Sequence, residues 1–247
     1  MSTLFVAWQA GDPSRAWFPI GRLDAEAAKD EYVFRYTRGA LHARDRAGFK
    51  PLVAFPEFER RYESSELFPL FKNRVLDPAR KDFAEYLGWL ALDPASADPI
   101  EILSLTGGER QTDSLEVFPK VQKRPDGTFR CRFFLHGLRH VSEAARKRAE
   151  LLRAEEGLQV AIEVNNPATG LAVQLQTADC HILGWAPRYL VHDLCAAISE
   201  HPSIEAKVTR INRADAPAAR RVLVELRGSL PTDVEPMTAD EYEVLAS

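Results

Sequence analysis

A small set of side chains in the second half of the chain could contact a nucleic acid: Arg139, His140, Asn166, Trp185 and Arg188. A single strand presents phosphates, which bind cations, and flat bases, which stack on aromatic rings at about 1–3 kcal/mol per base. The two arginines supply cations, the histidine and the tryptophan supply rings, and the asparagine amide can bond a base edge or a sugar. These residue types predict a nucleic-acid interface.

Other kinds of chemistry find little support. The sequence contains no phosphate-binding glycine loop, no nucleophile elbow, no zinc-protease motif and no kinase signature, so we expect neither an enzyme nor a cofactor. Cys180-His181 and His192-x-x-Cys195 place four metal-ligand types within a short stretch, but no C-x-x-C pair accompanies them. Cysteines and histidines in such a pattern usually belong to the core or the surface, and we expect no metal.

Composition bounds the protein class. The chain has 247 residues, a formal net charge of −4 and a pI near 5.9, so any attraction to nucleic acid must come from a local basic face. Its three cysteines are odd in number and scattered, which argues against a disulfide framework and predicts a cytoplasmic protein. No signal peptide and no apolar run of about 18 residues is present, which predicts no membrane contact.

The candidate side chains need strands and turns to position them. Residues 128–135 alternate apolar and polar side chains, and 142–156 predict a helix that is capped by Ser142 and stopped by Gly157. The stretch 157–194 predicts two or three short strands and a capped helix, broken at Asn165-Asn166-Pro167. Residues 205–212 and 220–227 alternate again and would complete a barrel.

Several residues of this half resemble one family. The sequence reads GLRH from Gly137, then an Asn-Asn-Pro turn, then Ala-Val-x-Leu from Ala172, then GWAPR from Gly184. This order is similar to the HIRAN domain, a small β-barrel that binds single-stranded DNA ends. The resemblance implies a barrel with two helices and a DNA-binding role.

The same resemblance assigns positions. Arg139-His140 occupy the place of an Arg-Tyr pair, Asn166 matches the asparagine of the turn, and Trp185 and Arg188 keep a ring and a cation. Ala168 and Thr169 stand where end-binding members have the tyrosine and aspartate that grip the terminal nucleotide and its 3′ hydroxyl. The resemblance therefore implies contact with single-stranded or distorted DNA more strongly than recognition of a 3′ end.

The first half predicts a small antiparallel sheet followed by helices. Short β-rich runs occupy Leu4–Gln9, Trp17–Leu23 and Glu31–Tyr36. Helices are predicted to start at Ser64-Ser65-Glu66, at Pro78 and near Ser96, and the last is predicted to stop at Gly107-Gly108. The aromatic residues at helical spacing here are expected in the core: Phe68, Phe71, Phe83, Tyr86 and Trp89.

This half also resembles a family. The runs PIGRL from Pro19, YVFRY from Tyr32 and FKNRVLDPAR from Phe71 are similar to the N-terminal subdomain of HipA-type toxin kinases. In that family the subdomain makes protein contacts, and the phosphotransfer residues lie in a later part, which this sequence lacks. The resemblance implies a protein partner for residues 1–120 and a role in a toxin–antitoxin or defence complex.

Together the patterns predict an α+β protein with a HipA-like module at residues 1–122, a HIRAN-like barrel at 127–230 and an acidic tail at 231–247. The tail is expected to be solvated or disordered, and the alternative is that it competes for a basic groove of the same chain. We expect a non-enzymatic accessory protein that binds DNA, and the alternative is a protein-interaction regulator. Two points stay open at this level. Trp185 is either a stacking ring or a core plug, and the basic run Arg146-Lys147-Arg148 is either a solvated helix face or a DNA contact.

Overall fold

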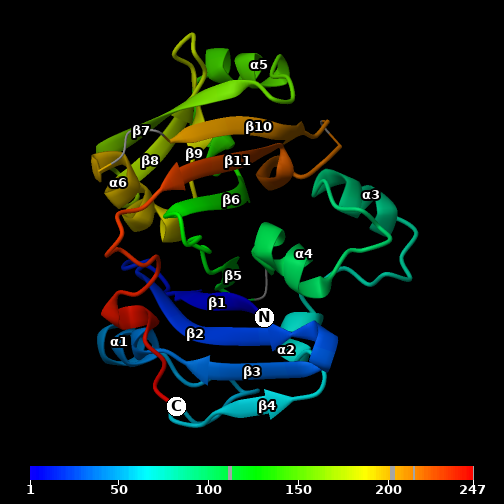
Figure 1. The fold of residues 1–247 in the computed structure, drawn as a ribbon, viewed down its shortest axis with the longest axis vertical. Coiled ribbons are helices and arrows are strands. Elements are labelled where there is room, and N and C mark those ends of the chain that lie inside the picture. Colours follow the sequence, from blue (N-terminus) through cyan, green and yellow to red (C-terminus); the bar gives the residue numbers. More distant parts are fainter. Residues whose placement is uncertain (111–112, 201–203, 214, 247) are drawn as a thin grey trace. The chain divides into compact units, whose positions relative to one another are not determined.

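The computed structural model describes residues 1–110, 113–200, 204–213 and 215–246. The chain is an α+β protein with two antiparallel sheets and helices, and it divides into two compact units (Figure 1). Unit 1 comprises residues 1–84, 93–120 and 237–247, and unit 2 comprises 85–92 and 121–236. In the described part, no helix has the length and apolar character needed to cross a membrane.

Unit 1 contains a sheet of five antiparallel strands. Its order is β4 (Tyr62–Ser64), β3 (Glu31–Tyr36), β2 (Trp17–Glu26), β1 (Ser2–Gln9) and β5 (Leu115–Pro119). The three predicted strands of this half are all present, and β3 has the predicted bounds. Pro19, which cannot donate to a ladder, lies in β2 beside a register shift between Val6 and Ala7 of β1.

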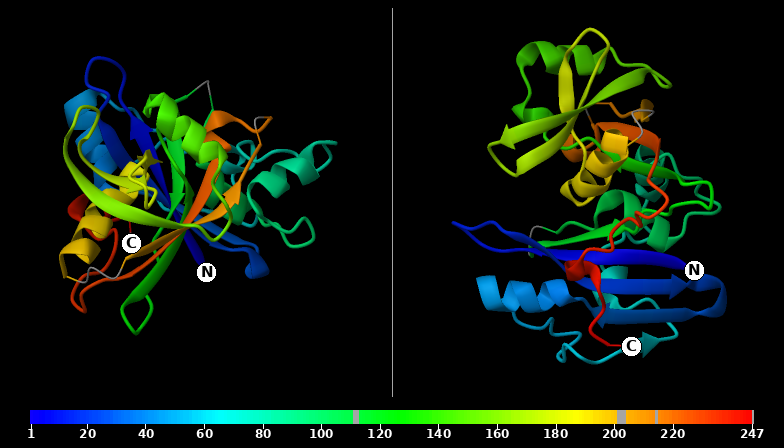
Figure 2. Two further views of the ribbon diagram at one scale, coloured as in Figure 1. Left: turned by 90° about the horizontal axis from the view of Figure 1, so that it is seen from above. Right: turned by 60° about the vertical axis from the view of Figure 1, so that its left-hand side comes forward.

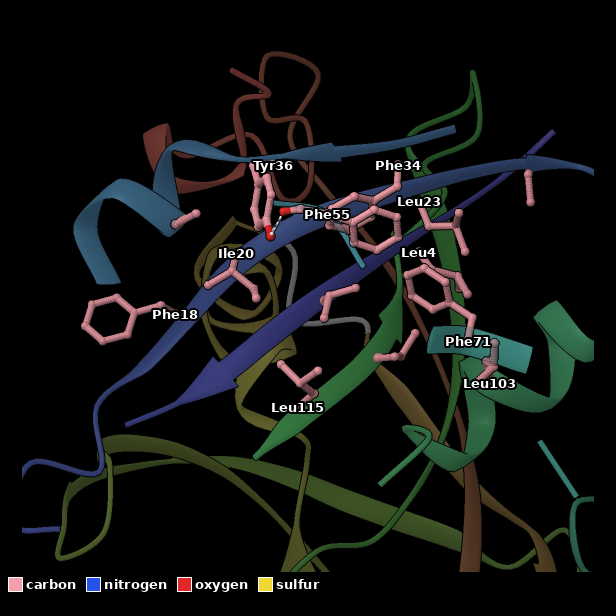
Figure 3. Close-up of a cluster of buried hydrophobic side chains, with 14 of the residues drawn as sticks. Leu4, Phe18, Ile20, Leu23, Phe34, Tyr36, Phe55, Phe71, Leu103 and Leu115 are labelled. Carbon is pink, nitrogen blue, oxygen red and sulfur yellow. Dashed lines mark hydrogen bonds between the residues drawn. The ribbon is translucent and has the colours of Figure 1, made fainter. Parts of the chain in front are cut away.

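The core of unit 1 combines aromatic and aliphatic side chains and lies against this sheet (Figure 3). Phe34 of β3 stacks on Phe55 with ring centroids 4.0 Å apart. The fully buried Tyr36 donates its hydroxyl to the Phe55 carbonyl at 2.8 Å and accepts from the Leu52 amide at 2.7 Å. Burial raises the pKa of this tyrosine, so the hydroxyl stays a donor and ties the loop to the sheet.

Four helices follow in the first 110 residues, and their starts differ from the predictions. They are α1 (Arg38–Ala47), α2 (Pro69–Lys72), α3 (Phe83–Trp89) and α4 (Pro99–Thr106). The start predicted at Ser64 was wrong, because Ser64 pairs with Tyr32 as the last residue of β4. Asp98 caps α4 and Gly107 ends it in the left-handed conformation, as the glycine pair predicted.

Helix α1 was not predicted at all. Its sequence is strongly basic. The residues that it buries are small: Gly39, Ala40 and Ala43. A Cβ on Gly39 would lie 2.0 Å from the Pro19 carbonyl oxygen, so the glycine allows the helix to approach β2 closely. Small residues of this kind leave no apolar stripe for sequence periodicity to detect.

The acidic tail is bonded to unit 1, while its carboxylates at Asp240 and Glu243 stay exposed to solvent. Residues 237–247 group with unit 1, where Arg38 pairs with Asp240 at 2.9 Å and with Glu243 at 3.0 Å. The Leu245 amide donates to the Tyr36 carbonyl at 2.9 Å. The tail thus has a basic partner on α1 and backbone bonds at the end of β3.

Unit 2 contains a sheet of six antiparallel strands. Its order is β6 (Thr128–Phe134), β11 (Val222–Ser229), β10 (Glu205–Ile211), β7 (Gly157–Asn166), β8 (Gly170–Gln176) and β9 (Ile182–Trp185). Figure 2 shows β7 and β8 as a long, bent hairpin. The strands predicted at 128–135, 157–194, 205–212 and 220–227 are therefore present with small shifts at their ends.

The predicted barrel was wrong, because the sheet does not close. Closure requires a continuous ladder between the first and last strands. In the described part, the edges β6 and β9 approach through an isolated bridge between His136 and Trp185. Gly137 turns the chain away at φ 76° on one side, and Pro187 lacks an amide donor on the other, so the bridge does not extend.

Two helices and one inserted segment complete unit 2. Ser142 caps α5 (Glu143–Glu150) as predicted, but the helix ends at Glu150 and not at residue 156. Helix α6 (Val191–Glu200) follows β9. Two hydrogen bonds hold the 85–92 segment to the sheet. Asn212 Nδ2 donates to the Trp89 carbonyl at 2.9 Å, and Arg132 Nη2 donates to the Leu90 carbonyl at 3.1 Å.

Candidate nucleic-acid interface

Trp185 lies on the polar face of the β7–β8–β9 ribbon. It pairs with Gln174 of β8, which pairs with Ala161 of β7, so these side chains share one face. The same face carries Glu163 and, opposite it, the small Ala172. Trp185 is half-buried and is not among the fully buried core residues, so part of its ring is accessible for stacking.

Glu163 joins two of the predicted site residues. Its Oε2 accepts a hydrogen bond from the indole Nε1 of Trp185 and another from Asn166 Nδ2 at 3.1 Å. Ala172 of β8 pairs with Glu163, and its small side chain leaves room for the Trp185 indole to reach the Glu163 carboxylate. Sequence analysis missed Glu163, because its side of the ribbon can be assigned only once the strand register is known.

Asn166 is engaged by its own turn. Its Oδ1 accepts hydrogen bonds from the Ala168 amide at 3.0 Å and from the Thr169 amide at 3.2 Å. Its side-chain nitrogen Nδ2 donates to the Glu163 carboxylate. These bonds occupy the side-chain oxygen and one of the two N–H donors that were predicted to contact a base or a sugar. Asn166 therefore shapes the β7–β8 turn.

Gly137 places Arg139 and His140 next to the tryptophan. The backbone of His136 exchanges two hydrogen bonds with Trp185, at 2.9 and 3.0 Å, and Gly137 follows directly under the ring. The next three residues form the short 3-10 helix η2 (Leu138–His140), whose arginine and histidine are exposed. Arg139 Nε donates to His140 Nε2 at 2.9 Å.

Arg188 is the predicted residue that the structure does not join to the others. It begins the 3-10 helix η3 (Arg188–Leu190) after the buried Ala186 and Pro187. Within the described residues, its partly exposed side chain makes no hydrogen bond or ion pair. It remains a cation three residues from Trp185 without a contact to the remaining site.

A groove lined by arginines adjoins the η2 turn. The groove has a volume of about 580 Å³, and its basic lining residues are Arg139, Arg146, Arg213 and Arg221. In the part of the chain that the structure describes, Arg139, Arg146 and Arg213 have no carboxylate partner. Arg146 Nη1 lies 3.4 Å from the Arg139 carbonyl, so α5 and η2 are linked at the groove.

The basic run of α5 consequently divides into three roles. Lys147 pairs with Glu143 at 2.8 Å on the exposed helix face. Arg148 is bound by Glu156 and by Asp179, the latter at 3.1 Å. Arg146 alone of the three lines the groove. Lys147 and Arg146 are both exposed, so both fit a solvated helix face, and Arg146 also lines the groove.

The histidines and cysteines that were weighed as metal ligands do not gather. No cluster of three ligand-type side chains occurs among the described residues, and His181 Nδ1 is instead 3.2 Å from Asp179. All three cysteines are free thiols. Burial, followed by the nearby charges of Asp193 and Glu225, raises the pKa of Cys131 to about 12.

Comparison with known proteins found no match among protein-family models, curated proteins or solved structures. The resemblances of the two halves to the HIRAN and HipA families therefore stay predictions.

Proposed function

We propose that unit 2 is a non-enzymatic module that binds single-stranded or distorted DNA. The observation that carries the proposal is the backbone pairing of His136 with Trp185, which puts the Arg139–His140 turn beside the indole ring. A cation and a ring held on paired backbone are the two groups that a single strand requires. Because the strands and Gly137 hold the ring in position, little side-chain entropy is lost on binding.

Glu163 modifies this surface. Its carboxylate holds the Trp185 indole and the β7–β8 turn, but it also repels phosphates close to the ring. A strand is therefore expected to place a base on the ring and its phosphates toward Arg139 and Arg188. The arrangement favours stacking at Trp185 and charge contact on either side of it.

Fluorescence anisotropy with a labelled single-stranded oligonucleotide, a tailed duplex and a blunt duplex tests the proposal. We expect micromolar or tighter binding to the first two, falling as salt rises from about 50 to 200 mM. The variant that combines Arg139→Ala with Arg188→Ala should lower the slope of log affinity against log salt by about 1.4, since each phosphate contact on a single strand contributes about 0.7. Arg124→Ala, at an exposed arginine of the turn before β6, is the matched control.

Absence of salt-sensitive binding to all three oligonucleotides would overturn the proposal. Binding that survives the double variant with an unchanged slope would leave the DNA-binding role and remove these two arginines from it.

The protein-interaction role of residues 1–120 stays a prediction. Among the described residues of that range, the exposed large apolar side chains are Met1 and Val53. Single exposed apolar residues are ordinary on soluble proteins and do not mark a partner.

A further inference from the structure

The arginine groove of unit 2 is built from four separate segments. Arg139 comes from η2, Arg146 and Ala149 from α5, Arg213 from the segment after β10, and Arg221 from the segment before β11. The buried Asn212 fixes the backbone beside Arg213, since its amide nitrogen donates to the carbonyls of Trp89 at 2.9 Å and Arg220 at 2.6 Å. The backbone beside Arg213 is thus fixed by the fold, and the exposed side chains of Arg139, Arg146 and Arg213 line the groove.

Its charge is unbalanced. Glu150 is the one acidic residue of the lining, and it forms no ion pair within the described residues. Guanidinium groups around a common space repel one another, and a bound anion relieves this repulsion. Arginine also matches phosphate geometry by offering paired N–H donors.

The remaining lining is apolar, and the volume limits what can enter. Leu138, Ala149, Ile211 and Ala218 contribute aliphatic surface between the arginines. The volume of about 580 Å³ lies in the range of about 300–1,000 Å³ that is usual for small-molecule sites. A nucleotide has this combination of a flat apolar part and an anionic group.

We propose that this groove binds the phosphomonoester of a nucleotide, either at the end of a DNA strand or on a free mononucleotide. A phosphomonoester carries about −1.5 to −2 charges at neutral pH, whereas an internal phosphodiester carries about one. The higher charge satisfies more of the arginine lining, so a terminal phosphate is bound in preference to an internal one. The inference shares Arg139 with the proposed function but stands on Arg146 and Arg213, which that function does not use.

The test compares oligothymidylates of equal length that carry a 5′-phosphate, a 3′-phosphate or only hydroxyls, together with thymidine monophosphate and thymidine as competitors. We expect at least one phosphorylated strand to bind about tenfold tighter than the hydroxyl strand. The variant that combines Arg146→Ala with Arg213→Ala should abolish that preference, while Arg124→Ala should keep it. Thermal melting of each variant verifies that the unit remains folded.

The measurements distinguish a strand end from a free nucleotide as the source of the phosphate. They also distinguish the arginine groove from the strand-binding surface at Trp185. Competition by thymidine monophosphate but not thymidine, at a similar affinity to the strand, assigns the groove to free nucleotides. A preference for the phosphorylated strand without such competition assigns it to strand ends. Trp185→Ala should weaken all strands equally and leave the phosphate preference intact, so failure of the strand-binding surface is distinguishable from failure of the groove. Equal binding of all strands with no competition by thymidine monophosphate overturns the inference.

Discussion

The indole ring of Trp185 lies directly against Gly137. A Cβ at residue 137 would be 2.6 Å from the ring's Cε3 and 2.8 Å from its Cζ3, and the glycine has a φ of 76°. The ring position, the η2 turn and the bridge to β9 therefore depend on a residue without a side chain.

Gly137→Ala should displace the Trp185 ring and weaken single-strand binding. Gly170→Ala is the matched control, because Gly170 has a φ of 75° and a Cβ there would meet nothing within 4 Å. Both variants introduce left-handed strain of about 1–2 kcal/mol, and only the first adds an overpacking cost of about 1–3 kcal/mol. Urea unfolding and anisotropy measure the two effects. Equal losses of stability and unchanged binding in the two variants would contradict the contact.

Glu163→Gln should increase the affinity for single-stranded DNA. The glutamine carbonyl can still accept from Trp185 and Asn166, while the negative charge next to the ring is removed. We expect a gain of about three- to tenfold at low salt that shrinks as salt rises, because the repulsion is screened. Glu205→Gln, at an exposed glutamate at the start of β10, is the control in the same unit. A loss of affinity in Glu163→Gln would mean that the carboxylate itself contacts the ligand.

Arg146→Ala and Arg148→Ala should have opposite effects although the residues are two positions apart. Arg146 is exposed and has no carboxylate partner in the described part, so its removal should change stability by less than about 0.5 kcal/mol and weaken phosphate binding. Arg148 links Glu156 and Asp179, so its removal should lower the unfolding free energy measurably and spare binding. Denaturant titration and anisotropy on the same preparations measure both. The reverse pattern would show that the groove has been assigned to the wrong face of α5.

Asp179 should contribute to acid sensitivity. Hydrogen bonds from Thr177 and then from Arg148 lower the pKa of Asp179 to about 2, from an ordinary value of 3.8. A carboxyl with a lowered folded-state pKa stabilises the fold above its unfolded pKa, and this contribution is lost as pH falls from 3.8 toward about 2. Asp179→Asn should therefore reduce the fall in unfolding free energy across that window, whereas Asp233→Asn, at an exposed carboxyl, should not. Identical pH profiles of the wild type and Asp179→Asn would contradict this role.

The three cysteines should react in a fixed order with iodoacetamide. Cys180 is exposed, whereas burial raises the pKa of Cys195 and, more strongly, that of Cys131, to about 12. Only the thiolate is nucleophilic, so at about pH 8 the native protein should be labelled first at Cys180 and last at Cys131. Mass spectrometry of labelled peptides gives the order, and unfolding in urea should make the three rates similar. Rapid labelling of native Cys131 would contradict its burial.

Local signals predicted many elements but few of their ends. The aromatic and β-branched run at residues 31–36 predicted a strand by residue type, and the alternation of residues 128–135 predicted one because a half-buried strand needs side chains of two kinds in turn. The Ser142 cap was also readable, since its oxygen accepts from the Ala145 amide three residues later. The predicted start at Ser64 was wrong because pairing with Tyr32 outweighed its capping preference.

The candidate site was predicted only in part, because local signals do not show which distant segments meet. Trp185, Arg139 and His140 were found by residue type, and the backbone bridge at His136 brings them together. Arg213 and Glu163 carried no local signal, since their neighbours come from segments distant in the sequence.

The sequence by itself determined the α+β class, most of the strands and the residue types that can contact a strand of DNA. Periodicity and turn chemistry act over a few residues, so they can be read without a fold. The tertiary structure decided that the second sheet stays open, that Asn166 is bound by its own turn and that Arg146 and Arg213 share a groove. These outcomes depend on strand register and on packing between distant segments, which no short stretch of sequence specifies.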